Sequence, residues 1–371
     1  MNSFLDLSQL TLLFLTSFSL CCFLTYISIK EKIISHKYSI DHKKGLQKIH
    51  NGNIKRIGGL PITLAFFLIL LIFTFFLNYK ISHELINILL FNAIIFTIGF
   101  IEDLIKDIRP VKRLSFLLIT TFIWLIYSQN TIQNTNIDFL DKILTVEYFA
   151  VILSLITIIS ALNATNMMDG ANGLLTGFGI LVSIILLSYA LKNNSLELII
   201  LLLAMIGVLS GFLIFNFPKG YIFLGDGGSY FIGATLSTIL IYMSNNLNYF
   251  SMLNALIIMV YPIWEIIFTI SRRIYKSSKI TNPDNFHLHS IINANLKKSK
   301  FVIKKKLNTN PLSAIIVNML AIIPSFIFLI YNSEKNLNDT GSVSFFILLL
   351  FLYTMIYLLL IKRNHKKTFK S

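Results

Sequence analysis

Carboxylate, amide and imidazole side chains gather in four short segments of a chain that is otherwise mostly apolar. The segments are Glu102-Asp103, Asn163 to Gly173, Phe223 to Ser229, and His287-Leu288-His289. Carboxylate and amide oxygens are hard ligands that suit Mg²⁺ or Mn²⁺, and glycine-rich turns let backbone N–H groups approach an anion. These residue types predict a site for a phosphate-bearing substrate with a divalent ion.

Basic side chains accompany these acids. Lys48, His50 and Arg56 precede the pair Gly58-Gly59, and Arg113 follows Glu102-Asp103. Acidic metal ligands surrounded by basic groups and glycines favour phosphoryl transfer. Two of these features have a second interpretation. The pair Gly58-Gly59 is equally typical of close helix packing. Glu265 is as compatible with a buried structural acid as with a catalytic one.

The elements that must position these residues are membrane helices. Hydrophobic residues make up 55% of the 371 residues, charged residues only 13%, and the mean hydropathy is +0.73. A soluble chain is roughly a quarter charged, so a soluble, disordered or nucleic-acid-binding protein is excluded. The adjacent Cys21 and Cys22 cannot form an ordinary disulfide with each other, which excludes a disulfide scaffold.

Ten stretches without Asp, Glu, Lys or Arg approach or exceed the roughly 20 residues that a spanning helix needs. They are 7–29, 57–79, 85–101, 114–137, 148–168, 170–191, 198–218, 227–264, 307–333 and 340–361. The stretch 227–264 is long enough for two spans, with a polar break at 244–248. We therefore predict an all-α polytopic membrane protein with about eleven transmembrane helices, in which residues 1–371 form a single membrane domain.

The basic residues predict the sidedness. Of the 32 Lys and Arg residues, 28 lie in alternate loops and the tail, namely 30–56, 102–113, 165–172, 218–228, 271–311 and 362–371. By the positive-inside rule these segments are cytoplasmic, with the N-terminus outside and the C-terminus inside. All four chemical segments then meet at the cytoplasmic face. We also expect one or two interfacial helices in 271–311 and a short surface loop at 129–145.

With these motifs the chain resembles the polyprenyl-phosphate sugar-1-phosphate transferases, the superfamily of the phospho-MurNAc-pentapeptide translocase and the undecaprenyl-phosphate GlcNAc-1-phosphate transferase. The resemblance covers about residues 45–295. Its motifs run in order: Lys-x-His…Arg-x-Gly-Gly from Lys48 to Gly59, the pair Glu102-Asp103, Asn-Ala-x-Asn-x-x-Asp-Gly-x-Asn-Gly-Leu from Asn163 to Leu174, Gly-Asp-x-Gly-Ser from Gly225 to Ser229, and His287-Leu288-His289. An eleven-helix count with the N-terminus outside agrees with this family.

The resemblance implies an Mg²⁺-dependent enzyme, with Mn²⁺ as an alternative ion. It would transfer a sugar 1-phosphate, of GlcNAc or a related 2-acetamido sugar, from a UDP-sugar to undecaprenyl phosphate and release UMP. This reaction initiates a surface polysaccharide such as lipopolysaccharide, or a cell-wall glycan. The resemblance also implies a multi-pass protein of the bacterial cytoplasmic (inner) membrane in contact with membrane lipids. It is compatible with a homodimer and implies no nucleic-acid partner.

The resemblance further implies a role for each site residue. The metal ligands would be Asp226 and Asn166. Asp103 and Glu102 would lie near the lipid phosphate, and the catalytic candidates are Asp103, Glu102, Asp226 and Asp169. Asn172 and Phe223 would contact the uracil, and His287 and His289 the pyrophosphate. The other substrate-binding candidates are Lys48, His50, Arg113 and Asn163.

Three positions depart from the family pattern. Glu102 replaces the usual Asp of the acidic pair, Ser290 stands where a third His is frequent, and 53–55 lacks the usual proline before Arg56. Because a His-His-His run is absent, we favour the surface-polysaccharide branch over the pentapeptide translocase, which stays the alternative. A secondary transporter or a lipid-linked sugar flippase is the alternative from another class. A transporter is expected to place its polar residues near the membrane midplane in two repeated halves, and no repeat is found.

Overall fold

The computed structural model describes residues 6–30, 40–41, 54–76, 80–105, 108–275, 286–335 and 339–368. Its helices are α1 (Leu7–Lys30), α2 (Gly59–Phe76), α3 (His83–Leu104), α4 (Pro110–Ser128), α5 (Asp138–Leu144), α6 (Glu147–Met168), α7 (Leu174–Lys192), α8 (Leu196–Asn216), α9 (Gly225–Asn246), α10 (Met252–Ile258), α11 (Val260–Tyr275), α12 (Leu288–Lys297), α13 (Lys300–Lys304), α14 (Thr309–Lys335) and α15 (Asp339–Thr368). The short strands β1 (Ile40–Asp41) and β2 (Ile54–Lys55) pair antiparallel. Lys48 and His50 lie outside the described residues.

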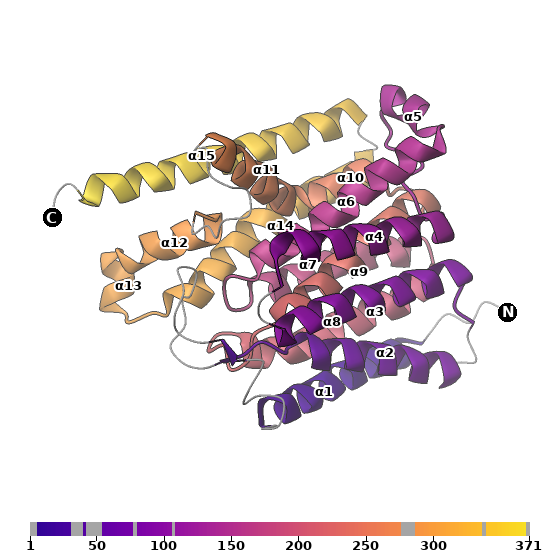
Figure 1. Cartoon of the computed structure of the whole chain (residues 1–371), viewed down its shortest axis with the longest axis horizontal. Coiled ribbons are helices and arrows are strands. Elements are labelled where there is room, and N and C mark those ends of the chain that lie inside the picture. Colours follow the sequence, from indigo (N-terminus) through magenta and orange to yellow (C-terminus); the bar gives the residue numbers. More distant parts are fainter. Residues whose placement is uncertain are drawn as a thin grey trace.

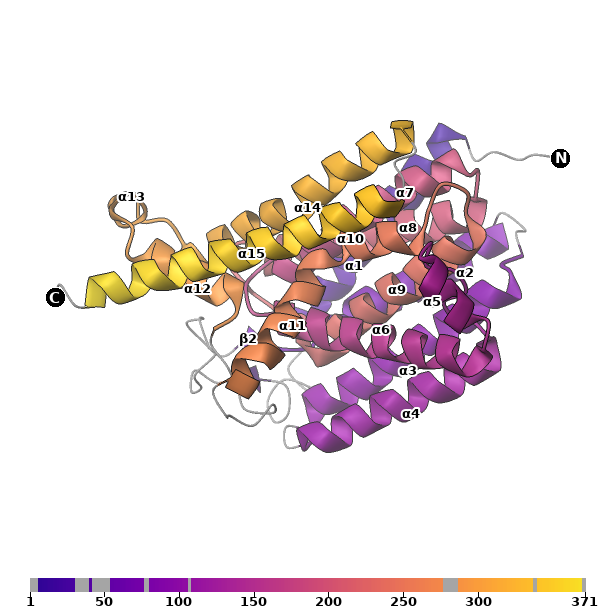
Figure 2. The same cartoon turned by 90° about the horizontal axis from the view of Figure 1, so that it is seen from above.

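The long helices lie side by side along a common direction (Figure 1; Figure 2). In the described part of the chain, nine helices are long and apolar enough to cross a membrane, and the bent pair α10–α11 makes ten. The predicted all-α polytopic membrane protein is thereby confirmed. The start of α1 and the end of α15 lie at opposite ends of the bundle. Which end faces the cytoplasm stays a prediction.

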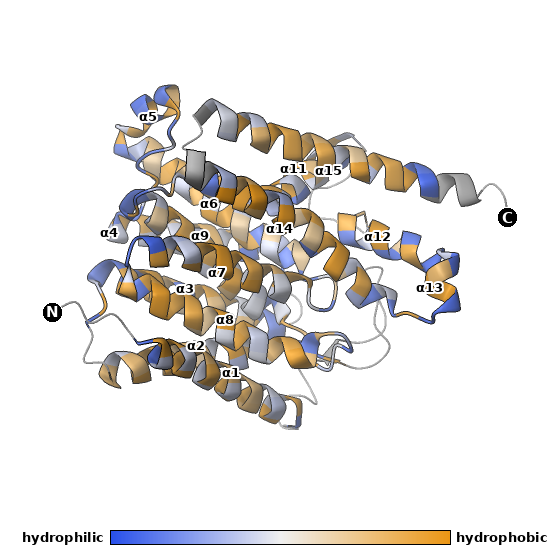
Figure 3. Ribbon diagram, turned by 180° about the vertical axis from the view of Figure 1, so that it is seen from behind, coloured by the Kyte–Doolittle hydropathy of each residue, from blue (hydrophilic) through white to orange (hydrophobic). Residues whose placement is uncertain are grey.

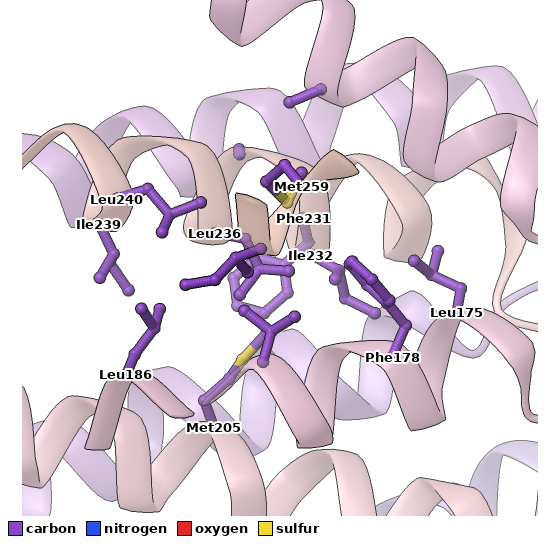
Figure 4. Close-up of a cluster of buried hydrophobic side chains, with 14 of the residues drawn as sticks. Leu175, Phe178, Leu186, Met205, Phe231, Ile232, Leu236, Ile239, Leu240 and Met259 are labelled. Atoms are coloured by element: carbon purple, nitrogen blue, oxygen red, sulfur yellow. The ribbon is translucent and has the colours of Figure 1, made fainter. Parts of the chain in front are cut away.

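The eleventh predicted span corresponds to α9, whose glycine, serine and threonine residues make it less apolar than the others. Of its 22 residues, 17 are buried, because α9 packs against α2, α3, α6 and α10 inside the bundle. Phe231, Ile232 and Leu236 of α9 face Phe178 and Met205 in this core (Figure 4). A helix shielded from lipid by protein needs less hydropathy than one that faces lipid. As predicted, the 227–264 stretch breaks after Asn246.

Two prolines shape the C-terminal helices. The axes of α10 and α11 differ by 69°, a bend that the hydropathy of this stretch does not predict. Pro262 cannot donate to the carbonyl of Ile258, and its ring would clash with that carbonyl in a straight helix. Pro324 likewise leaves the Leu320 carbonyl in α14 without its usual donor. The Tyr353 hydroxyl of α15 donates to this carbonyl at 3.1 Å, which satisfies it at membrane depth.

The loop prediction for 129–145 is wrong in part, because α5 occupies its second half. Asp141 accepts hydrogen bonds from the N–H and the hydroxyl of Thr135 at 2.7 and 2.6 Å. Acidic residues in a first helical turn are also favourable for the helix dipole. The asparagines at 130, 134 and 136 are typical of an irregular loop, so the sequence does not indicate the helix that follows them. Two short helices, α12 and α13, lie in 271–311, and their position at a membrane interface stays a prediction.

Candidate active site

The centre of the site is the N-terminus of α9. Gly225 has a φ of +78°, a conformation that favours glycine. After this turn, the N–H groups of Asp226 and Gly227 donate to the two carboxylate oxygens of Asp103, each at 2.9 Å. Asp103 lies at the end of α3 and is only 8% exposed. Its negative charge is favourable beside the N-terminus of a helix, so the contact fixes the position of Asp226.

Glycines bring the helix ends together at this point. The N–H groups of Gly58 and Gly59 donate to the carbonyls of Phe223 and Leu224 at 2.9 and 2.8 Å. A Cβ on Gly59 would collide with the backbone of Gly228. The helix-packing interpretation of Gly58-Gly59 is therefore confirmed, and the start of α2 is fixed to the start of α9.

Three acids surround the guanidinium of Arg56. Its Nη2 lies 3.1 Å from Asp226 Oδ1 and its Nε lies 3.9 Å from Asp103 Oδ1. Asp169, directly after α6, accepts a hydrogen bond from the backbone N–H of Gly225. Burial raises the pKa of Asp169 to about 7, although the charge of Arg56 favours ionisation. The structure thus brings together Asp103, Asp169 and Asp226, three of the four predicted catalytic residues.

Glu102, the fourth, belongs to a neighbouring network. Arg113 Nη1 donates to Glu102 Oε1 at 3.0 Å, and the Tyr230 hydroxyl lies 3.5 Å from Glu102 Oε2. Asn166 Nδ2 donates to the same hydroxyl at 3.3 Å. Tyr230 was not predicted. Its position, one helical turn after Asp226, places it on the same face of α9, and this spacing is the signal that would have found it.

The two histidines of the His287-Leu288-His289 segment lie between Glu265 of α11 and the segment that contains Asp169. Glu265 of α11 is buried, and its Oε1 atom lies 2.8 Å from His287 Nδ1. Its Oε2 atom accepts a hydrogen bond from the N–H of Leu288 at 3.4 Å. Glu265 is therefore a buried acid that binds a neighbouring segment and fixes the start of α12. The His287 and His289 rings stack with centroids 5.6 Å apart. His289 contacts the position of Gly170, next to Asp169.

The surroundings of His289 favour its neutral form. His289 is 3% exposed, and burial together with the neighbouring His287 lowers its pKa to about 4. His289 is consequently neutral at physiological pH and can donate one hydrogen bond to an anion without carrying charge.

Three predicted substrate-binding residues have other contacts. The Asn172 amide donates to the Pro218 carbonyl at 3.1 Å, and its N–H donates to Asn310 Oδ1 at 2.8 Å. Asn163 donates to the Ile159 carbonyl within α6, with no hydrogen bond to the other site residues in the described ranges. Phe223 is half-buried, and its N–H donates to the Lys55 carbonyl at 2.9 Å.

The oxygen ligands suit a hard divalent cation. No group of three or more His, Cys, Asp or Glu side chains that could hold a metal exists within the described ranges. A mixed set fits Mg²⁺ chemically: the carboxylates of Asp226 and Asp169 with the amide oxygen of Asn166. Because Asn166 uses its amide nitrogen to contact Tyr230, its oxygen is left for a ligand.

Comparisons with known proteins find one family and several relatives. The model of glycosyl transferase family 4 matches residues 85–244. A probable undecaprenyl-phosphate N-acetylglucosaminyl 1-phosphate transferase of Bacillus subtilis is 27% identical over 66% of this chain and 66% of its own length. A putative UDP-N-acetylglucosamine–dolichyl-phosphate N-acetylglucosaminephosphotransferase of Sulfolobus acidocaldarius is 32% identical over 53% of this chain and 61% of its own length.

An undecaprenyl-phosphate alpha-N-acetylglucosaminyl 1-phosphate transferase of Escherichia coli K12 is 24% identical over 74% of both chains. The chain thus spans between about 60% and 75% of the length of these relatives. The family match contains the acidic pair of α3, the Asn-rich end of α6 and the N-terminus of α9. The chain is therefore similar to glycosyl transferase family 4 over residues 85–244 and to polyprenyl-phosphate sugar-1-phosphate transferases over a longer range, and it is an enzyme.

Proposed function

We propose that this enzyme transfers a sugar 1-phosphate from a UDP-sugar to undecaprenyl phosphate and releases UMP, with Mg²⁺ as cofactor. The observation that carries the proposal is the position of Asp226. The Asp103 carboxylate fixes it at the N-terminus of α9, between Arg56 and the loop of Asp169. An acid held among hard oxygen donors, a guanidinium and a helix N-terminus suits a metal-bound pyrophosphate.

The reaction exchanges one phosphorus–oxygen bond for another. An oxygen of the lipid phosphate attacks the sugar-1-phosphate phosphorus, the bond to the UMP phosphate breaks, and UMP leaves with the electron pair. Mg²⁺, when bound, would neutralise charge on the pyrophosphate. Asp226 and Asn166 would hold the ion, with Asp169 beside them. Arg56 would attract the phosphates, and His289 would donate a hydrogen bond to the pyrophosphate.

Three further roles complete the proposal. Glu102, oriented by Arg113 and Tyr230, would lie on the acceptor side. Phe223 would stack on the uracil, and Asn172 would line the same pocket. The names of the bacterial relatives support GlcNAc as the sugar. The enzyme would act at the cytoplasmic face of the bacterial inner membrane, in the first step of a surface polysaccharide.

The decisive experiment combines purified protein, Mg²⁺, undecaprenyl phosphate and a panel of UDP-sugars, and measures UMP. The panel includes UDP-GlcNAc and UDP-MurNAc-pentapeptide. We expect UMP to appear only with the lipid, the ion and UDP-GlcNAc all present, and Asp226→Asn to abolish it. The matched control is Asp138→Asn, an exposed acid of α5, which should retain full activity.

Two results would contradict the proposal. If UDP-MurNAc-pentapeptide were the one donor of the panel that released UMP, the enzyme would be a pentapeptide translocase. Exchange of labelled UDP-sugar across proteoliposomes without any UMP would indicate a transporter.

A further inference from the structure

Exposed lysines form a cluster beyond the histidine segment. The cluster, which we call the lysine surface, comprises Lys297, Lys300, Lys304, Lys305 and Lys306 of α12, α13 and the turn after them, and all five are exposed. The sequence from 285 to 333 contains no Asp or Glu. The cluster therefore has no acidic residue on its own segment, and it is further from the catalytic acids along the chain than the histidines are.

Large apolar side chains are exposed among these lysines. Phe301 is 66% exposed, Ile303 61% and Leu307 44%, whereas Val302 between the first two is buried. Both hydrophobic and hydrophilic residues are accordingly seen at α13 (Figure 3), where Phe301, Val302 and Ile303 stand between Lys300 and Lys304. An exposed phenylalanine and isoleucine are unfavourable in water. Basic and large apolar residues together are typical of segments that lie in a membrane interface.

The lysine surface lies directly beside two membrane helices. Only one residue, Asn308, separates Leu307 from the start of α14, which is a candidate span. The Asn295 amide of α12 donates to the Leu360 carbonyl of α15 at 3.3 Å, and α15 continues to the exposed Lys362 and Arg363. Figure 1 shows α13 next to the start of α14. The positive charges are thus placed where the bundle leaves the membrane.

We propose that the lysine surface docks onto acidic phospholipid headgroups of the adjacent leaflet, with Phe301 and Ile303 inserted between the lipids. Charge complementarity and the start of α14 support this partner over a soluble one. A basic segment next to a spanning helix is attracted to an anionic leaflet by each lysine it contains. The inference concerns lipid docking and does not depend on the proposed transferase reaction.

The first test uses a fluorophore whose emission reports the polarity around it. Cys21 and Cys22, the only cysteines of the chain, are replaced by serine, and Phe301→Cys carries the label in nanodiscs. We expect blue-shifted emission, and quenching by brominated acyl chains, in phosphatidylglycerol–phosphatidylcholine discs but not in phosphatidylcholine alone. A label at Asn136→Cys, an exposed residue of the 129–137 segment, should show neither the blue shift with phosphatidylglycerol nor the quenching by brominated acyl chains.

The second test removes charge. Replacing Lys300, Lys304 and Lys305 with glutamine should raise the phosphatidylglycerol fraction needed for the shift, with apparent affinity falling on the order of 10²-fold, since each lysine contributes about fivefold. The matched control replaces Lys80, Lys142 and Lys192, which lie outside the surface, and should change nothing. Arginine at the three surface positions should preserve the response, which also shows that substitution there is compatible with folding.

Three outcomes would overturn the proposal. The first is water-like emission at 301 in both lipid mixtures. The second is a glutamine variant that responds to phosphatidylglycerol like the parent protein. The third is reversal of the shift by inorganic phosphate at equal ionic strength, which would indicate a site for free phosphate.

Discussion

Asp103 Oδ1 accepts the backbone N–H of Asp226 at 2.9 Å, so one acid of the site determines where another one lies. The side chain that the family resemblance places near the lipid phosphate is at the same time the cap of α9. In the proposed reaction, donor and acceptor recognition would therefore be connected through Asp103.

Asp103→Asn should impair both halves of the reaction. Asparagine would present its NH₂ group to one of two N–H donors, and the start of α9 would shift. We expect turnover to fall by about 10²–10³, the effect of losing one key electrostatic group, and Mg²⁺-dependent binding of the UDP-sugar to weaken as well. Titration calorimetry measures the binding. Glu102→Gln, which leaves the Asp226 and Gly227 hydrogen bonds to Asp103 intact, should reduce turnover only. Unchanged binding in Asp103→Asn would contradict the capping role.

Asp226 and Asn166 should act through the same ion. Asp226→Asn is expected to lower turnover by about 10²–10³ or more. Asn166→Ala should lower it too, and the double variant should be little worse than Asp226→Asn alone, because residues that act as a unit are not additive. The measurement is the rate of UMP release over a range of Mg²⁺ concentrations. Additive losses would show that the two side chains serve different steps.

Glu265 should be a positioning residue for His287. Glu265→Gln removes the charge that accepts two hydrogen bonds, which are worth about 1.5–3 kcal/mol each for a charged group. We expect about a 10- to 100-fold fall in kcat, and a changed ¹⁵N signature of the His287 ring. Glu265→Asp should recover part of both. A variant with low activity and unchanged His287 ring signals would contradict the positioning role.

Phe223→Ala tests the uracil pocket. Stacking of a base on an aromatic ring is worth about 1–3 kcal/mol, so the affinity for UDP-sugar should fall by roughly tenfold or more. The dependence of the rate on lipid phosphate should stay the same. Competition by UMP provides a direct readout, and a variant that alters only the lipid dependence would place the uridine elsewhere.

His289 should make stability fall in weak acid. Its pKa is lowered from 6.5 to about 4 in the folded protein, so the unfolded chain binds a proton first as the pH drops. The contribution of His289 to stability is therefore constant above about pH 6.5 and is lost progressively between pH 6.5 and 4, by about 2 kcal/mol at pH 5. Asp169, whose pKa is raised to about 7, changes stability in the opposite direction, so the prediction concerns the difference between variants. Between pH 6.5 and 5, thermal unfolding in detergent should show the parent protein and His83→Asn, an exposed control, losing about 2 kcal/mol relative to His289→Asn.

Much of the fold follows from the order of polar and apolar residues. Runs without charge predict the spanning helices, and the break after α9 follows from Ser244 to Asn248. The 69° bend was not predictable. Proline is tolerated in many membrane helices, and whether Pro262 bends its helix depends on what packs around it. The helix α5 was concealed by the asparagines that precede it.

The site was predictable in its members but not in their contacts. The residue types of Asp103, Asp169 and Asp226 indicate one polar cluster. Nothing in the sequence says that Asp103 binds the backbone of α9, since that contact depends on how closely glycines let helices approach. Glu265 and His287 lie on separate elements with the segment 276–285 between them, so their pairing also needs three-dimensional information.

The separation of Asp103 from α9 has a consequence for biosynthesis. Asp103 and Asp226 are 123 residues apart, so the ribosome delivers α3 to the membrane well before it has made α9. Until then the Asp103 carboxylate lacks the N–H groups that satisfy it, and an unpaired acid is costly away from water. The end of α3 must therefore stay at the aqueous surface while α4 to α8 are inserted. A nascent chain cut before Gly225 would be left with this acid uncapped, whereas synthesis of the start of α9 supplies the two N–H groups for Asp103 and brings Asp226 to the site in one step.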